Sequence, residues 1–72
     1  MMKLAERMKE LRNERNLSQA GLAAELKIGV ATYCRYEQGK REPDASVLWR
    51  MADYYDVSVD YLLGRSERRK SD

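Results

Sequence analysis

The sequence predicts an all-α domain of five short helices. Apolar residues recur three and four positions apart, which is the spacing that puts side chains on one face of an α-helix. Serine, aspartate or glycine precedes four of the five apolar segments, and these residue types are favoured where a helix begins. A chain of 72 residues suffices for one domain, and a domain of this size buries only about 60% of the surface that its unfolded chain exposes.

The first predicted helix begins near Leu4 and ends within residues 13–16. Leu4, Met8 and Leu11 lie at i, i+4 and i+7 and form its inner face, with Ala5 beside them. Charged residues are spread through this segment, so it has the character of neither a signal peptide nor a membrane span. We therefore expect no contact with a membrane and a location in the cytoplasm.

The second predicted helix runs from Ser18 to Leu26. Ser18 can accept a backbone N–H bond at the helix start, and Leu22, Ala23 and Leu26 form one apolar stripe. Gly29 then breaks the helix and can serve as the N-cap of the next one. The resulting turn of about three residues is typical of a helix-turn-helix.

The third predicted helix covers residues 30–38 and is stopped by Gly39. At about 100° per residue, Thr32, Tyr33 and Tyr36 fall on one side of it. The opposite side carries Val30, Ala31, Cys34, Arg35 and Gln38. The first side is expected to pack against the domain, which leaves the second side open to another molecule.

Two further helices are predicted after Pro43. Asp44 can cap a fourth helix that reaches about Tyr55, and the aspartate at position 56 is a residue type that tolerates the left-handed conformation. Ser58 can cap a short fifth helix that Gly64 ends. The inner faces are expected to consist of Leu48, Met51, Ala52 and Tyr55 in the fourth helix and of Val59, Leu62 and Leu63 in the fifth.

Residues 65–72, RSERRKSD, contain no apolar side chain. Such a segment cannot bury enough apolar surface to offset the entropy of ordering it. The predicted organisation is therefore one domain over residues 1–64, followed by a disordered basic C-terminal tail over residues 65–72.

A series of residues in and around the second and third helices carries a specific resemblance. They are Gln19, Leu22, Ala23, Leu26, Ile28, Thr32, the run RYEQGKR at residues 35–41, and Pro43. In this order they resemble the Cro/phage-repressor family of helix-turn-helix proteins, also called the xenobiotic-response-element type. The similarity extends to residues 8–12 upstream and to residues 48–63 downstream, and it covers about Leu4 to Gly64.

The resemblance implies a compact, lambda-repressor-like fold of five helices with the helix-turn-helix at helices two and three. It also implies a left-handed residue at Asp56, where the fourth helix ends. It also implies a sequence-specific regulator of transcription, most simply a repressor that binds a palindromic operator in double-stranded DNA as a homodimer. In this motif the second of the two helices enters the major groove. The alternative is an antitoxin-like or partner-binding module that uses the same fold to hold a regulatory protein.

Four residues on the open side of the third helix are the predicted base readers. Arg35 can bond guanine O6 and N7 together, and Gln38 can bond adenine, although both residues could instead contact phosphate. Val30 and Ala31 are apolar where many relatives are polar, so their side chains can contact thymine methyl groups but cannot hydrogen-bond a base.

Three residues are predicted to contact the DNA backbone. Gln19 resembles the family residue that opens helix two, where an amide and nearby backbone N–H groups meet phosphate. Lys40 and Arg41 lie in the loop after helix three, which the resemblance places along the phosphates. The alternative for all three is an ordinary solvated side chain.

Arg12 and Glu37 match family positions that pair across helices one and three. Such a buried bridge would orient the third helix, and removal of one partner would leave an uncompensated charge. The alternative is two separate surface charges.

Trp49, Tyr54 and Tyr61 lie off the inward stripes and are the predicted dimer interface, because aromatic side chains are enriched where proteins associate. A dimer through helices four and five would place the two recognition helices about 34 Å apart. The alternative is that the rings cover the edge of the core.

Charge is distributed unevenly along the chain, although the net charge is only +2. Residues 1–43 carry nine Lys or Arg against six Glu, whereas residues 44–64 carry one Arg against four Asp. The basic part contains the helix-turn-helix, and helices four and five would face away from a phosphate backbone. Ordinary scatter of charge in a small protein is the alternative.

The residue inventory argues against several classes of protein. Histidine is absent and cysteine occurs once, so we expect no disulfide, no metal site, no cofactor and no enzyme activity. A redox role for Cys34 on the third helix is conceivable, but no resolving cysteine exists. A small tolerated side chain is the simpler interpretation of Cys34.

Overall fold

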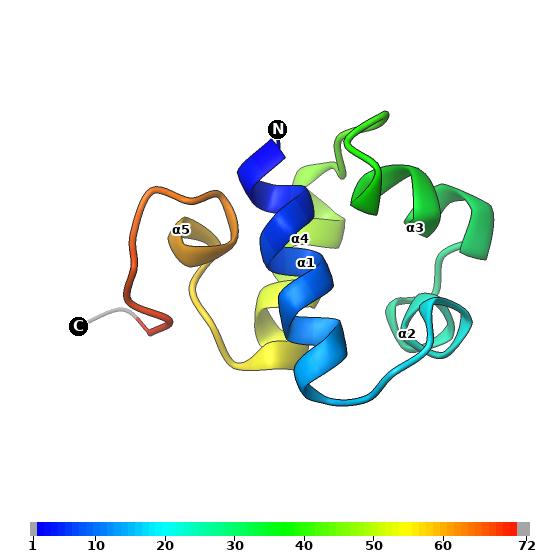
Figure 1. The fold of residues 1–72 in the computed structure, drawn as a ribbon, viewed down its shortest axis with the longest axis horizontal. Coiled ribbons are helices and arrows are strands. Elements are labelled where there is room, and N and C mark those ends of the chain that lie inside the picture. The colour runs from blue at the N-terminus through cyan, green and yellow to red at the C-terminus, as the bar shows by residue number, and fades with distance from the viewer. Residues whose placement is uncertain (1, 71–72) are drawn as a thin grey trace.

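The computed structural model describes residues 2–70 and confirms the all-α prediction (Figure 1). Its five helices are α1 (Met2–Glu14), α2 (Gln19–Leu26), α3 (Val30–Glu37), α4 (Ala45–Tyr55) and α5 (Val59–Leu62). No residue in this described range forms a strand. The order and spacing of the helices agree with the sequence prediction.

Three of the four helices that follow a connection begin with the side-chain cap that the sequence predicted. Ser18 Oγ accepts a bond of 2.9 Å from the backbone nitrogen of Gly21. Asp44 Oδ1 accepts one of 3.0 Å from Val47, and Ser58 Oγ accepts one of 3.0 Å from Tyr61. Gly29 precedes α3 in an extended conformation and contributes no side-chain cap.

Three helices are followed by a left-handed residue that is not glycine, and the first of these is Asn16, with φ = 55°, two positions after α1 ends at Glu14. Asp56 has φ = 56°, as predicted, and ends α4. Lys27 has φ = 59° and ends α2, where its backbone N–H bonds to the carbonyls of Ala23 and Ala24. Lysine carries no turn signal, so the sequence predicted the break at Gly29, two positions later.

The five helices enclose one core. In Figure 1, α2 and α3 lie on one side of α1 and α5 lies on the other, and α1 contacts both α3 and α5. The α4 helix contacts α2 and α5. The buried apolar side chains include Leu4, Met8, Leu11, Leu22, Leu26, Tyr33, Tyr36, Met51, Tyr55 and Leu62.

The predicted inner face of α4 needs one correction. Val47 is buried, with 4% exposure, whereas Leu48 is half-buried at the edge of the core. The reason is the register of the helix, because Val47, Met51 and Tyr55 recur every four residues and point along one line into the core.

Residues 65–70 form no helix or strand, but they are attached to the domain by contacts that the sequence did not predict. The guanidinium of Arg69 pairs with Glu14 on α1, and Lys70 Nζ lies 2.7 Å from a carboxylate oxygen of Asp56. Arg7 Nη1 donates to the carbonyl of Ser66 over 3.3 Å. The last two residues of the predicted tail, 71 and 72, lie outside the described residues.

Candidate nucleic-acid interface

The α2 and α3 helices form a helix-turn-helix in which α3 has one buried and one open side. Residues 27–29 join the two helices, and the helices pack against each other. Tyr33, Tyr36 and Glu37 are buried on the inner side of α3. In Figure 1, α3 lies at the periphery of the molecule, on the far side of α1 from α5.

The structure places all four predicted base readers on the open side of this motif. Val30 is 47% exposed, and Ala31, Arg35 and Gln38 are also exposed. Within residues 2–70 the side chains of Arg35 and Gln38 have no hydrogen-bond or ion-pair partner. Both polar groups are therefore free to bond another molecule.

Two of the predicted phosphate contacts lie in the exposed loop that follows α3. Lys40 and Arg41 are both exposed there, next to Gly39, whose φ of 73° turns the chain away from the helix. With Arg35, these residues make three cations on α3 and directly after it. The loop thus adds positive charge beside the open side of the helix.

Gln19 has partners that the sequence analysis did not anticipate. Its Nε2 donates to Glu37 Oε1 over 3.2 Å, and its Oε1 accepts a bond of 3.2 Å from the thiol of Cys34. Gln19 is half-buried as a result. The first residue of α2 is therefore tied to α3 by its side chain, while its backbone N–H has no intrahelical acceptor, as at any helix start.

Arg12 and Glu37 are brought together by the structure. Arg12 Nε lies 2.7 Å from Glu37 Oε2, and Arg12 Nη2 lies 3.2 Å from Oε1, so the pair is bidentate. The carboxylate side chain is only 2% exposed. Glu37 Oε2 also accepts a hydrogen bond from the hydroxyl of Tyr33, one turn earlier on α3. Two carboxylate oxygens thus serve donors from α1, α2 and α3.

These contacts set the protonation of the groups around Glu37. Burial raises the pKa of the Glu37 carboxyl, but the hydrogen bonds from Arg12, Tyr33 and Gln19 outweigh it and hold that pKa below its ordinary value. The hydrogen bond to Glu37 raises the pKa of Arg12. Burial, and then the Glu37 carboxylate, raise the pKa of the Tyr33 hydroxyl. The carboxylate is therefore ionised and the phenol is neutral at pH 7.

The predicted dimer residues divide into one exposed, one half-buried and one buried ring. Trp49 is 65% exposed, and Tyr54 is half-buried. The prediction that Tyr61 lies on the surface is wrong, because its side chain is only 5% exposed. The guanidinium of Arg7 lies 3.9 Å from the centre of the Tyr61 ring and covers it.

Sequence reasoning missed Arg7 itself. This cation is 4% exposed, and its Nη1 donates to the carbonyl of Tyr61 over 2.9 Å. Its position three residues after Leu4 and one before Met8 falls on the buried arc of α1, and that register is the signal that could have found it.

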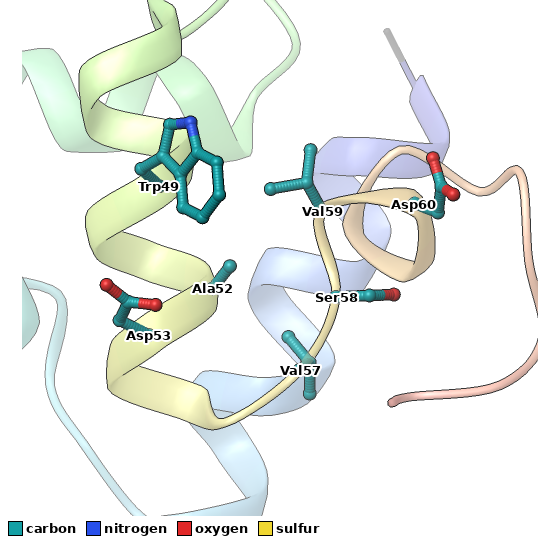
Figure 2. Close-up of a pocket in the computed structure, with 7 residues that line it drawn as sticks. All are labelled: Trp49, Ala52, Asp53, Val57, Ser58, Val59 and Asp60. Carbon is teal, nitrogen blue, oxygen red and sulfur yellow. The ribbon is translucent and has the colours of Figure 1, made fainter. Parts of the chain in front are cut away.

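A hollow of about 370 Å³ lies beside Trp49 (Figure 2). Its wall comes from α4 and from the segment that leads into α5, and its residues are Trp49, Ala52, Asp53, Val57, Ser58, Val59 and Asp60. In Figure 2 the indole projects from α4 toward Val59 across the hollow. The hollow is apolar at its centre and acidic at its edges.

Two further observations bear on function. Within residues 2–70, no three side chains of the metal-binding types gather closely enough to hold a metal ion. Among the described helices, none is long and apolar enough to cross a membrane.

Comparison with known proteins identifies the family. The family model described as helix-turn-helix matches residues 8–62. The chain belongs to the helix-turn-helix family. The matched range includes Gln19, the whole of α3, the loop with Lys40 and Arg41, and both partners of the Arg12–Glu37 pair.

Named relatives of this helix-turn-helix chain are regulators and repressors. The chain is 39% identical over 69 residues to the HTH-type transcriptional regulator ImmR of Bacillus subtilis. The aligned region covers 96% of this chain and 54% of ImmR. The chain is 38% identical to the cryptic phage CTXphi transcriptional repressor RstR of Vibrio cholerae, and this aligned region covers 89% of this chain and 57% of RstR. The chain thus spans about half the length of these relatives.

A solved structure has the same fold. It is the crystal structure of a transcriptional regulator from Listeria innocua, with a TM-score of 0.83 and 30% sequence identity. The similarity covers 96% of this chain and 64% of that protein.

We expect Arg12→Ala to lower the free energy of unfolding by about 3 kcal/mol, because it leaves the buried Glu37 carboxylate without its cation. Urea unfolding measures the change. Lys9→Ala, at an exposed position on the same helix, is the matched control and should alter stability by less than about 0.5 kcal/mol. Equal stability of Arg12→Ala and the natural protein would show that the pair does not anchor α3.

The lowered pKa of Glu37 makes stability depend on pH in a defined direction. Between that lowered pKa and the ordinary glutamate pKa of about 4.3, the unfolded chain binds more protons than the folded one, so stability falls as pH falls. Urea unfolding at pH 7 and at pH 3 should show a smaller acid loss for Glu37→Gln than for the natural protein. Parallel pH profiles for the two proteins would contradict this assignment.

Proposed function

We propose that the protein binds a specific sequence in double-stranded DNA and regulates transcription from it, acting as a repressor. The observation that carries this proposal is the open side of α3. It presents an unpaired Arg35 and Gln38, while the opposite side of the same helix is fixed through Glu37. The names of the relatives support it, since ImmR is a transcriptional regulator and RstR a transcriptional repressor.

In the proposed complex α3 lies in the major groove. Arg35 donates two hydrogen bonds to O6 and N7 of a guanine, a contact worth about 1–3 kcal/mol of discrimination against other bases. Gln38 bonds an adenine or a phosphate, and Val30 and Ala31 contact thymine methyl groups. Because only one strong hydrogen-bonding reader is present, the motif indicates the activity better than it indicates the target sequence.

The phosphate contacts flank this helix. Lys40 and Arg41 bind the backbone from the loop after α3. Gln19 can bind a second phosphate without leaving Glu37, because its amide has two N–H donors and the carboxylate uses one of them. Glu37 then orients the Gln19 amide that binds the phosphate.

A homodimer on a palindromic operator is the second part of the proposal. With Tyr61 buried under Arg7, the surface for association narrows to Trp49, the adjoining hollow and the exposed edge of Tyr54. A large exposed aromatic side chain beside an apolar hollow is a typical association surface. The dimer would place its two α3 helices about 34 Å apart, one turn of B-DNA.

The same exposed Trp49 favours one other function, a module that holds a regulatory protein. A pure protein-binding module predicts no protected DNA site and no steep loss of DNA affinity with salt. Selection of bound duplexes from random DNA with the purified protein therefore separates the two functions. Recovery of a palindrome supports regulation by a dimer, and recovery of no sequence argues against it.

On the selected duplex, Arg35→Ala should weaken binding by about 1–3 kcal/mol and relax the preference at one base pair in each half-site. Lys40→Ala should weaken binding to every sequence alike and reduce the salt slope by about 1. Titrations at several salt concentrations measure both effects. A uniform loss of affinity in Arg35→Ala, with the base preference unchanged, would make Arg35 a phosphate contact.

Substitution of the exposed indole tests the dimer. Trp49→Ser should shift the mass in sedimentation equilibrium from dimer to monomer and weaken binding to the palindrome, because the apolar contact is lost. Lys9→Ser, on the exposed side of α1, should leave the mass unchanged. A monomer mass for the natural protein, both with and without the palindrome, would remove the dimer from the proposal.

A further inference from the structure

The first turn of α3 presents apolar groups on its open side. Val30 and Trp49 are the two large apolar side chains that are exposed among the described residues, and Val30 is one of the proposed base readers. Ala31 beside it is exposed and adds a methyl group. Gly29, which precedes both, has no side chain that could bond a base.

The neighbouring polar side chains are either on the other side of the helix or already paired. Thr32 is half-buried on the side of α3 that carries Tyr33 and Tyr36, and the thiol of Cys34 donates to Gln19. Arg35, one turn after Ala31, is therefore the first side chain on this side that has free hydrogen-bond donors. The side chains of Val30 and Ala31 can therefore recognise a base edge by apolar contact and not by hydrogen bonds.

The major groove offers one apolar group to such a surface, the C5 methyl group of thymine. A cytosine methylated at C5 carries the same group on the same ring carbon, whereas uracil and unmodified cytosine lack it. Side chains without donors or acceptors respond to the methyl group and not to the exocyclic oxygen or amine beside it.

We propose that Val30 and Ala31 form a receptor for the C5 methyl group of pyrimidines, so that the protein distinguishes thymine from uracil and 5-methylcytosine from cytosine. This inference rests on the proposed DNA-binding function. The favoured element is a C5-methylated pyrimidine close to a guanine, because Ala31 and Arg35 lie on the same side of α3, four residues apart. The class of ligand is thus methylated double-stranded DNA, with the methyl group supplied either by thymine or by cytosine methylation.

Two physical arguments support the assignment. An exposed valine does not stabilise the helix that carries it, because valine is a weaker helix former than alanine. Covering Val30 with a methyl group would remove both apolar surfaces from water, and this favours the complex that contains the methyl group over the one that lacks it. Removal of one contacted methyl group should weaken binding about fourfold.

The experiment uses the duplex recovered by random selection and the natural protein. Each thymine is replaced in turn by deoxyuridine, which removes the methyl group and leaves the O4 acceptor in place. We expect about fourfold weaker binding at one or two positions in each half-site and no change at thymines outside the selected element. At the sensitive positions, a 5-methylcytosine–guanine pair should bind about fourfold more tightly than a cytosine–guanine pair.

Two variants connect the effect to its residues. Val30→Ser should bring the thymine-to-uracil affinity ratio close to one, while Arg35→Ala should weaken both duplexes and leave their ratio unchanged. The ratio for the natural protein remains decisive even if a variant is unstable. Equal affinity for thymine and uracil at every position overturns this inference while leaving the DNA-binding proposal intact. Failure to select any duplex overturns that proposal itself.

Discussion

The geometry of the helix-turn-helix depends on the hydrogen bonds that the buried carboxylate of Glu37 accepts. It is nearly inaccessible to water, and an isolated ionised carboxyl in such a place would be costly. Its cost is offset by Arg12 from α1, Gln19 from α2 and Tyr33 from its own helix. The donors belong to α1, α2 and α3. Hydrogen bonding of all three to one buried carboxylate therefore fixes the relative placement of these helices.

The contacts of Glu37 also explain why the two sides of α3 differ. The inner residues hold the helix by packing and by charge, so the outer residues have no structural duty and can vary with the target. Apolar side chains at the start of the open side are tolerated for that reason, and Arg35 remains unpaired within the described chain. Gln19 connects the two roles, since one amide contacts the buried carboxylate and lies at the start of the helix proposed to meet phosphate. A phosphate bound there would act on the same carboxylate that positions α3.

Local signals predicted most of the fold. The caps at Ser18, Asp44 and Ser58 each depend on one residue type, and the structure contains all three. The left-handed residue at Asp56, which the family resemblance implied, is present as well. Sequence reasoning was less successful where tertiary contacts decide the outcome. Tyr61 looked like a surface ring because its cover, Arg7, lies 54 positions away and is charged. The partners of Gln19 could not be foreseen either, because amide hydrogen bonds have no periodic pattern in a sequence. The open side of α3 was predictable, since it needs only helical geometry and the resemblance of the motif.

The course of residues 65–70 has a practical consequence. In Figure 1 this segment lies at one end of the molecule beyond α5, and α3 lies toward the other end of the long axis, whose extent is 33 Å. Arg7 and Glu14 on α1 hold it there. A fluorophore or label attached within this segment would therefore lie at the end of the domain that is remote from α3. Immobilisation through this end would leave α3 facing the solution, which suits measurements on a surface.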